Sequence, residues 1–340
     1  MEYSKTPKEI ELYLREEKAK FEKQKSEPKL LILGPSDSGK STFLKQIKLL
    51  YGKGFSKEDQ IQSKRTIINN IIHAIDTIFK LLMSYSIHHL DNLILEPSSR
   101  IQFQLLIDQL LSFRDNQLDY FSQPILEAIV CFWNCDYVQK IYHSLNDNAI
   151  PTTTSYFFQH VQRITSESGM PTNEDLLMIR VITKSVSDTV FTIDGINIHF
   201  YDVSGLVHHR KQWISYFEDV LNVIFIVSLS SYDQMMIEDE SKNRLMDSIH
   251  LFEYIFNHPL LKKADVILFF NKKDLFEIKI RKISFKKYFP DFRDRSLSEA
   301  YTYTKEKFKK IAKDSPKTLF THLTCCTDTK AMKSIISDIM

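Results

Sequence analysis

The segment GPSDSGKS, residues 34–41, contains the residue types that bind a chain of phosphates. It follows the apolar run KLLIL and precedes the helical pattern STFLKQIKLL, which is the order of strand, loop and helix in a Walker A motif. In such a loop, backbone N–H groups surround the β-phosphate, Lys40 reaches the β- and γ-oxygens, and the Ser41 hydroxyl takes a magnesium position. A chance glycine-containing turn would lack this flanking order. The motif predicts nucleotide binding without separating ATP from GTP.

A second polar cluster, Asn271-Lys272-Lys273-Asp274, follows the apolar run DVILFF. It therefore lies at the carboxyl end of a strand, where open α/β sheets bind ligands. A carboxylate there pairs with guanine N1–H and the 2-amino group, whereas adenine offers no such pair of donors. A solvated charged turn is the alternative reading of NKKD taken by itself. Together with the phosphate loop, Asp274 predicts selection of guanine.

The elements that would position these residues alternate between short apolar runs and amphipathic helices, as in VIFIVSL followed by ESKNRLMDSIHLFEYIF. That alternation is typical of a mostly parallel sheet with helices on both faces. Asp194-Gly195 predicts a hairpin turn between two further strands. No glycine occurs between Gly54 and Gly169, where Ile, Leu and Phe recur at helical spacing. We interpret that stretch as an all-helical domain inserted into an α/β domain.

The composition of the 340-residue chain is that of an ordinary globular protein, with 43% hydrophobic and 26% charged residues. A net charge of +2 is too balanced to indicate a nucleic-acid partner. The four cysteines have neither zinc-site nor disulfide-framework spacing, which favours reduced thiols in the cytosol. The charged N-terminal segment does not resemble a signal peptide, and no run reaches the roughly 18 apolar residues of a membrane span.

These motifs together make the chain resemble the alpha subunits of heterotrimeric G proteins, from about Lys29 nearly to its C-terminus. The phosphate loop, DLLMIRVITKS, DVSGL, HRKQWISYFE, NKKD and TCCTDT occur in that family's order and at about its spacing. The resemblance implies a Ras-like P-loop GTPase domain with a mostly parallel six-stranded sheet, in residues 29–54 and 173–340. It also implies an inserted helical domain in residues 55–172 and an N-terminal helix in residues 1–28.

The resemblance further implies roles for individual residues. Arg180 would be an arginine finger supplied in cis, and Asp37 would bridge to it across the two domains. Ser41 and Thr183 would bind Mg²⁺ directly, Asp202 would hold it through a water, and the Gly205 N–H would contact the γ-phosphate. Thr324, Cys325 and Cys326 would pack on guanine. The full set implied for GTP or GDP is Gly34, Asp37, Ser38, Gly39, Lys40, Ser41, Thr42, Leu177, Arg180, Asp202, Gly205, Asn271, Lys272, Asp274, Cys325 and Cys326, with Arg180, Lys40 and Gly205 serving hydrolysis.

Two departures from the family pattern predict slow hydrolysis. Where the family reads DVGGQ, this chain reads DVSGL, so Leu206 replaces the glutamine that orients the attacking water. Loss of one preorganised polar group typically costs about 3 kcal/mol of transition-state stabilisation. Ser36 stands where the family has a glycine beside the γ-phosphate. A third departure places Pro151-Thr152-Thr153 where an acidic residue of the helical domain normally meets Lys272, which predicts weaker domain closure unless a threonine bonds Lys272 or the ribose.

The implied partners are a βγ dimer, an effector and a seven-helix receptor. The segment Arg210–Glu218 would be the main βγ surface, with Trp213, Ile214 and Phe217 as an apolar stripe, although such residues are more often ordinary core. Met1-Glu2 excludes N-myristoylation, so we expect a cytoplasmic protein that reaches the inner face of the plasma membrane through βγ. Only 13 residues follow Thr327, about half of the family's last helix and tail, which argues against receptor coupling.

The sequence leaves three functions open. They are a guanine-nucleotide switch that hydrolyses GTP slowly, a GTP-binding scaffold or decoy that does not cycle between GTP and GDP, and a P-loop kinase or ATPase. Asp274 argues against the third, because an adenine enzyme has no use for it. Arg180, Thr183 and Asp202 favour the switch, because a scaffold needs none of them. Leu206 favours the scaffold.

Overall fold

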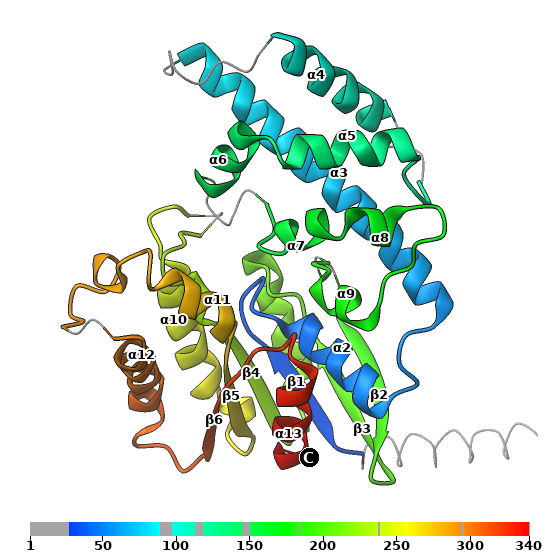
Figure 1. Cartoon of the computed structure of the whole chain (residues 1–340). Coiled ribbons are helices and arrows are strands. Elements are labelled where there is room, and N and C mark those ends of the chain that lie inside the picture. The colour runs from blue at the N-terminus through cyan, green and yellow to red at the C-terminus, as the bar shows by residue number, and fades with distance from the viewer. Residues whose placement is uncertain are drawn as a thin grey trace, which may run out of the picture.

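The computed structural model of the chain describes residues 27–88, 97–112, 118–144, 150–181, 183, 185–236, 239–293 and 296–339. Its centre is a six-stranded sheet with the strand order β2-β3-β1-β4-β5-β6 (Figure 1). The strands are β1 (Lys29–Leu33), β2 (Ser187–Ile193), β3 (Ile196–Asp202), β4 (Asn222–Ser228), β5 (Asp265–Asn271) and β6 (Leu319–Leu323). Every neighbouring pair is parallel except β2 and β3. The predicted mostly parallel sheet is confirmed.

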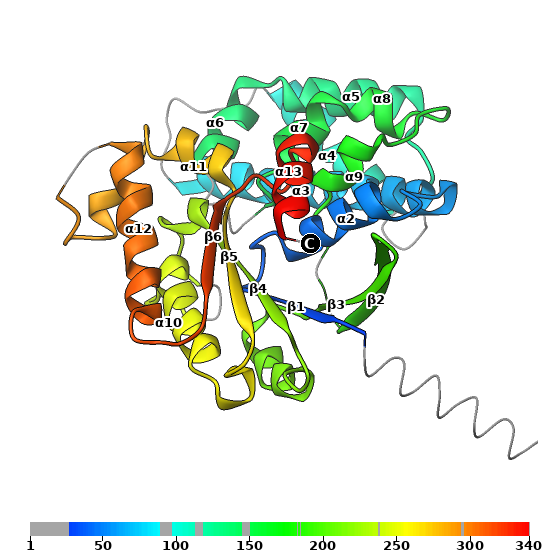
Figure 2. The same cartoon turned by 90° about the horizontal axis from the view of Figure 1, so that it is seen from below.

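Helices cover both faces of this sheet, because the central strands alternate large apolar side chains between the two faces. Leu31 and Leu33 of β1 pack into one buried cluster, and Leu30 and Ile32 pack into another. The first cluster includes residues of α10 (Arg244–Phe256), α11 (Lys273–Lys279) and α12 (Leu297–Ala312). The second includes residues of α2 (Lys40–Tyr51) and α13 (Thr329–Ile339). Figure 2 shows these two sets of helices on opposite sides of the strands.

The predicted hairpin joins β2 to β3 through Asp194 and Gly195, which both have positive φ angles, of 50° and 82°. Two successive residues with positive φ form the turn type that matches the right-handed twist of the flanking strands. Asp tolerates that conformation better than most residues and glycine adopts it without strain. The Asp-Gly pair therefore fixes the register in which Ile193 faces Ile196.

The stretch without glycine folds into helices that share a separate buried core above the sheet (Figure 1). These helices are α3 (Lys57–His88), α4 (Pro97–Ser112), α5 (Gln123–Trp133), α6 (Asp136–Ser144), α7 (Thr154–Gln159) and α8 (Val161–Thr165). The short helix α9 (Asn173–Met178) joins that core through Leu176 and also contacts α2. The helical insertion is observed, while the domain limits at residues 55 and 172 stay a prediction.

Among the residues that the structure describes, one helical segment, Lys57–Met83 of α3, is long and apolar enough in composition to cross a membrane. No such segment was expected from the sequence. More than half of its apolar window is buried inside the protein, as in the core helix of a soluble fold. The predicted N-terminal helix falls almost entirely in residues 1–26, outside the described residues.

The segment predicted as a helix over Arg210–Glu218 differs from the expectation. It forms a 3₁₀ helix, η1 (Val207–Tyr216), in which side chains three residues apart are eclipsed. Trp213 and Phe217 are buried in the core beside the sheet, whereas Ile214 is 41% exposed. The apolar stripe is therefore divided between core and surface, and Phe217 lies just beyond η1 as its C-terminal cap.

Candidate functional site

The phosphate loop connects β1 to α2, and the side chain of Lys40 bonds back to the start of the loop. Lys40 Nζ donates hydrogen bonds to the carbonyl oxygens of Gly34, at 2.9 Å, and Pro35, at 2.8 Å. Burial lowers the pKa of Lys40 to about 8, although the Asp202 carboxylate opposes this shift. A buried cation that donates to carbonyl oxygens would be further stabilised by a bound anion.

Gly39 gives this loop its close contact with the end of β5. Its φ angle is 109°, and a Cβ atom there would lie 2.1 Å from Asn271 Nδ2. Asn271 Nδ2 donates to the Ser38 carbonyl at 2.8 Å, while its Oδ1 accepts from the Cys326 N–H at 2.9 Å. Asn271 therefore joins the phosphate loop to the loop after β6, and any side chain at residue 39 would disrupt that junction.

Three oxygen-bearing side chains meet beside the loop. Ser41 Oγ lies 2.9 Å from Thr183 Oγ1 and donates to Asp202 Oδ2 at 3.0 Å. The other carboxylate oxygen, Asp202 Oδ1, is buried and has no hydrogen-bond partner within the described residues. Burial raises the pKa of Asp202, while Lys40 and Ser41 lower it. Two hydroxyls and an incompletely paired carboxylate are hard oxygen ligands of the kind that Mg²⁺ prefers, so these residues fit the ion.

Asp37 lies between two cations at the cavity wall. Its carboxylate is 3.0 Å from Lys272 Nζ and 3.9 Å from Arg180 Nε. Burial disfavours the charged form, but Lys272, Arg180 and Arg244 together hold the pKa of Asp37 below its usual range. Both Asp37 and Lys272 have positive φ angles, of 59° and 60°, which are uncommon for residues other than glycine. The predicted Asp37–Arg180 bridge is present, and Asp37 also supplies Lys272 with a carboxylate from within the α/β domain.

The segment after β3 approaches the phosphate loop closely. A Cβ atom at Gly205 would lie 2.4 Å from Lys40 Nζ and 2.5 Å from the Ser36 nitrogen. Ser204 is fixed to η1 twice, because its carbonyl accepts from Trp213 Nε1 at 2.9 Å and its hydroxyl lies 2.9 Å from His209 Nδ1. Movement of Gly205 would therefore be passed to η1.

These elements surround a cavity of about 300 Å³ between the sheet and the helical insertion. Three of the residues predicted to contact the nucleotide or the metal do not line it, namely Gly34, Asp202 and Thr324. Each bonds a side chain that does, which is Lys40 for Gly34, Ser41 for Asp202 and Asn271 for Thr324. The predicted residues that do line it are Asp37, Ser38, Gly39, Lys40, Ser41, Thr42, Leu177, Arg180, Thr183, Gly205, Asn271, Lys272, Asp274, Cys325 and Cys326, together with Leu206. The structure thus brings together residues separated by almost the whole sequence.

Several residues at this cavity were not predicted from the sequence. Ser155, Tyr156 and Leu275 also line it. Arg244, at the start of α10, donates to the Ser36 carbonyl at 2.8 Å and so supports the phosphate loop from outside the cavity. No local motif marks Arg244. Thr152 and Thr153, which were considered from the sequence as partners of Lys272 or the ribose in place of an acidic residue, do line the cavity.

Comparison with known proteins gives one consistent result. The sequence model of the family described as G-protein alpha subunit matches residues 4–340. The guanine nucleotide-binding protein alpha-2 subunit of Caenorhabditis elegans is 34% identical over 316 residues, covering 92% of this chain and 86% of that protein. The guanine nucleotide-binding protein G(o) subunit alpha of Lymnaea stagnalis is 34% identical over 312 residues, with the same two coverages. The similarity therefore spans the sheet, the helical insertion and the cavity between them.

Proposed function

Since this chain belongs to the G-protein alpha subunit family, we propose that it is a guanine-nucleotide switch that binds GTP and GDP with Mg²⁺ and hydrolyses GTP slowly. One observation carries the proposal: a single cavity gathers a phosphate-binding lysine, an oxygen-rich cluster for a cation, an arginine and a carboxylate at the base end. Lys40, Ser41, Arg180 and Asp274 represent these four functions. A site for an unrelated phosphorylated ligand would not need Asp274.

In this proposal each group acts on a different part of GTP. Lys40 leaves the carbonyls of its own loop and binds the β- and γ-oxygens, while Arg180 stabilises the charge that develops on the transferring phosphoryl group. The Ser41 and Thr183 hydroxyls would hold Mg²⁺, with Asp202 behind them. When bound, the ion neutralises charge on the β- and γ-oxygens. Water attacks the γ-phosphorus, the bond to the β–γ bridging oxygen breaks, and GDP and inorganic phosphate leave.

Leu206 is the reason to expect slow turnover. It lines the cavity next to Gly205, where a polar side chain would be needed to orient the attacking water. A hydrocarbon side chain neither donates nor accepts a hydrogen bond, so Leu206 cannot orient the water and the reaction would depend on Lys40, Arg180 and Gly205.

The direct test is equilibrium binding of a fluorescent GTP analogue with Mg²⁺, followed by competition with unlabelled GTP, GDP and ATP. We expect GTP and GDP to compete at least 100-fold better than ATP, because a site that pairs with a base strongly rejects one lacking the matching donors. Single-turnover hydrolysis then separates the switch from the scaffold. Equal competition by ATP would overturn the guanine assignment, and tight GTP binding without hydrolysis would favour the scaffold.

We also propose that a βγ dimer binds the GDP form and brings the chain to the membrane. Ile214 is the exposed member of the predicted stripe, and η1 is joined to Gly205 through Ser204, so the surface would respond to the γ-phosphate. We expect βγ to co-purify with the GDP form and to bind several-fold less to a form loaded with a non-hydrolysable GTP analogue.

Substitution tests the surface separately from the core. Ile214→Asp should weaken βγ binding in a pull-down without changing GDP affinity. Phe320→Asp, at an apolar residue of β6 that is also exposed, is the matched control and should bind βγ normally. Trp213→Ala is unsuitable, because Trp213 is buried and its loss would disturb the fold. Equal βγ binding by wild type and Ile214→Asp would remove η1 from the interface.

A further inference from the structure

Arg180, proposed as the arginine finger, follows the C-terminal cap of a short helix that is held at both ends. Helix α9 ends at Met178, Ile179 is its extended C-terminal cap, and Arg180 comes next. Leu176 and Ile179 are buried in the core of the helical insertion. The position of Arg180 therefore depends on how firmly α9 and its cap are held.

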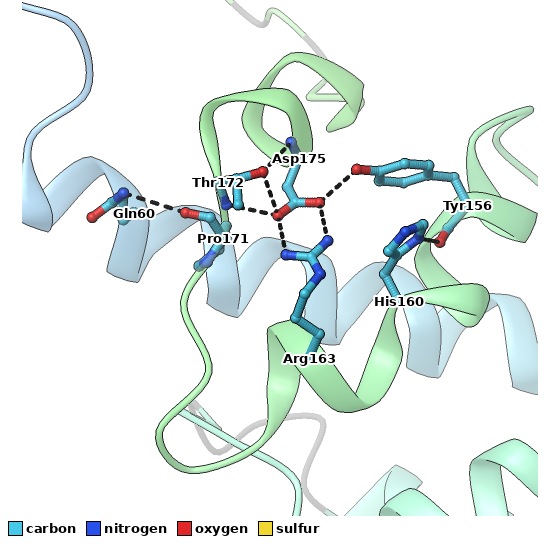
Figure 3. Close-up of polar contacts among 7 residues, drawn as sticks. All are labelled: Gln60, Tyr156, His160, Arg163, Pro171, Thr172 and Asp175. Carbon is cyan, nitrogen blue, oxygen red and sulfur yellow. Dashed lines mark hydrogen bonds and ion pairs between the residues drawn. The ribbon is translucent and has the colours of Figure 1, made fainter.

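The helical insertion holds the beginning of α9 through the carboxylate of Asp175 (Figure 3). The side chain of Asp175 is fully buried. Arg163 donates two hydrogen bonds to it, at 2.8 and 2.9 Å, and Tyr156 Oη donates a third at 2.7 Å. The N–H and hydroxyl of Thr172 complete the set in a capping box. Burial opposes ionisation, but these donors lower the pKa of Asp175 to about 2. A fully paired buried carboxylate makes this end of α9 rigid.

The GTPase domain holds the other end of α9 through one side chain. Lys45 Nζ, from α2, donates to the carbonyl oxygens of Leu176, at 2.8 Å, and Ile179, at 3.0 Å. The last carbonyls of a helix lack partners within it and carry partial negative charge, so a lysine ammonium both satisfies and stabilises them. Lys45 lies about one helical turn after Lys40 and Ser41 on α2. The same helix therefore carries the phosphate-binding lysine and holds the residue before Arg180.

From this geometry we propose, building on the function proposed above, that Lys45 is a positioning residue for Arg180. It fixes the peptide before the arginine relative to the helix that binds the phosphates, so that the guanidinium reaches the γ-phosphate in the correct place. Lys45 does not line the cavity, and it acts through the backbone of α9.

The test is Lys45→Met, which keeps the length of the side chain and removes its donors. Single-turnover GTP hydrolysis should slow by about 10- to 100-fold, because a displacement of about 1 Å at a catalytic group has that scale of effect. GTP affinity should change by less than about 3-fold, which also verifies that the variant folds. Lys45→Arg, which retains donors, should recover part of the rate.

Two further variants separate positioning from general damage. Lys48→Met, on the same helix, removes a 2.8 Å ion pair with Asp59 that does not involve α9, and it should hydrolyse GTP at the wild-type rate. In an Arg180→Ala background, Lys45→Met should add less than about a 2-fold loss, because the group it positions is gone. A normal rate for Lys45→Met, or full additivity with Arg180→Ala, would overturn the proposal. If Arg180→Ala itself left hydrolysis unchanged, the proposed function of Arg180 would fail as well.

Discussion

Asp274→Asn is expected to change the base preference of the cavity from guanine to xanthine nucleotides. In the proposed complex, the carboxylate of Asp274 would accept hydrogen bonds from guanine N1–H and the 2-amino group. An asparagine amide supplies one donor in place of an acceptor, which mismatches guanine and matches the 2-oxo group of xanthine. Rejection of a base that leaves such groups unpaired is on the order of 1000-fold or more. Competition of GTP and xanthosine triphosphate for a fluorescent nucleotide measures the ratio for each protein.

Glu277→Gln is the matched control for this change. Glu277 lies on the same helix, α11, and pairs with Lys273 at 3.7 Å without lining the cavity. It should keep the wild-type preference for GTP. If Asp274→Asn bound GTP as tightly as the wild type, Asp274 would not be the base-recognition residue, whatever binds the phosphates.

The parts of the site that lie within one strand–loop–helix unit could be predicted from sequence. The loop between β1 and α2, and the NKKD segment after β5, have the positions their spacing indicated, because connections in a parallel sheet bring both loops to the same edge. The hairpin at Asp194-Gly195 was predictable for a similar reason, since two positive φ angles restrict which residues can form it.

Contacts between elements distant in the sequence could not be predicted in the same way. Asp37 and Lys272 are 235 positions apart in the sequence. Their 3.0 Å ion pair forms because the fold brings two loops together, each with an uncommon positive φ angle at the pairing residue. Lys45 carries no motif, and its two bonds go to backbone carbonyls, which any sequence would provide. The 3₁₀ form of η1 was missed because an apolar stripe at residues 213, 214 and 217 fits an α-helix as well.

Leu206→Gln is expected to accelerate single-turnover GTP hydrolysis by roughly 10- to 100-fold. The variant places an amide at the cavity wall beside Gly205, where it can accept from the attacking water and donate toward the γ-phosphate. One preorganised group of this kind is worth about 3 kcal/mol, and a glutamine among unadapted neighbours such as Ser36 should realise part of it. Leu206→Met is the control of similar volume without hydrogen-bonding groups, and it should hydrolyse GTP at the wild-type rate.

Substitution of Arg180 tests whether that gain in rate comes from the proposed mechanism. In the proposed mechanism the glutamine would orient the water, whereas Arg180 would stabilise charge on the phosphoryl group that the water attacks, so the two groups would act on the same transition state. Adding Arg180→Ala to Leu206→Gln should remove most of the gain, and Arg180→Ala alone should slow the wild type further. A wild-type rate already equal to that of Leu206→Gln would mean that another group orients the water. The hydroxyl of Ser36, whose backbone nitrogen lies beside Gly205, would then be the first candidate, and Ser36→Gly would be expected to slow the reaction.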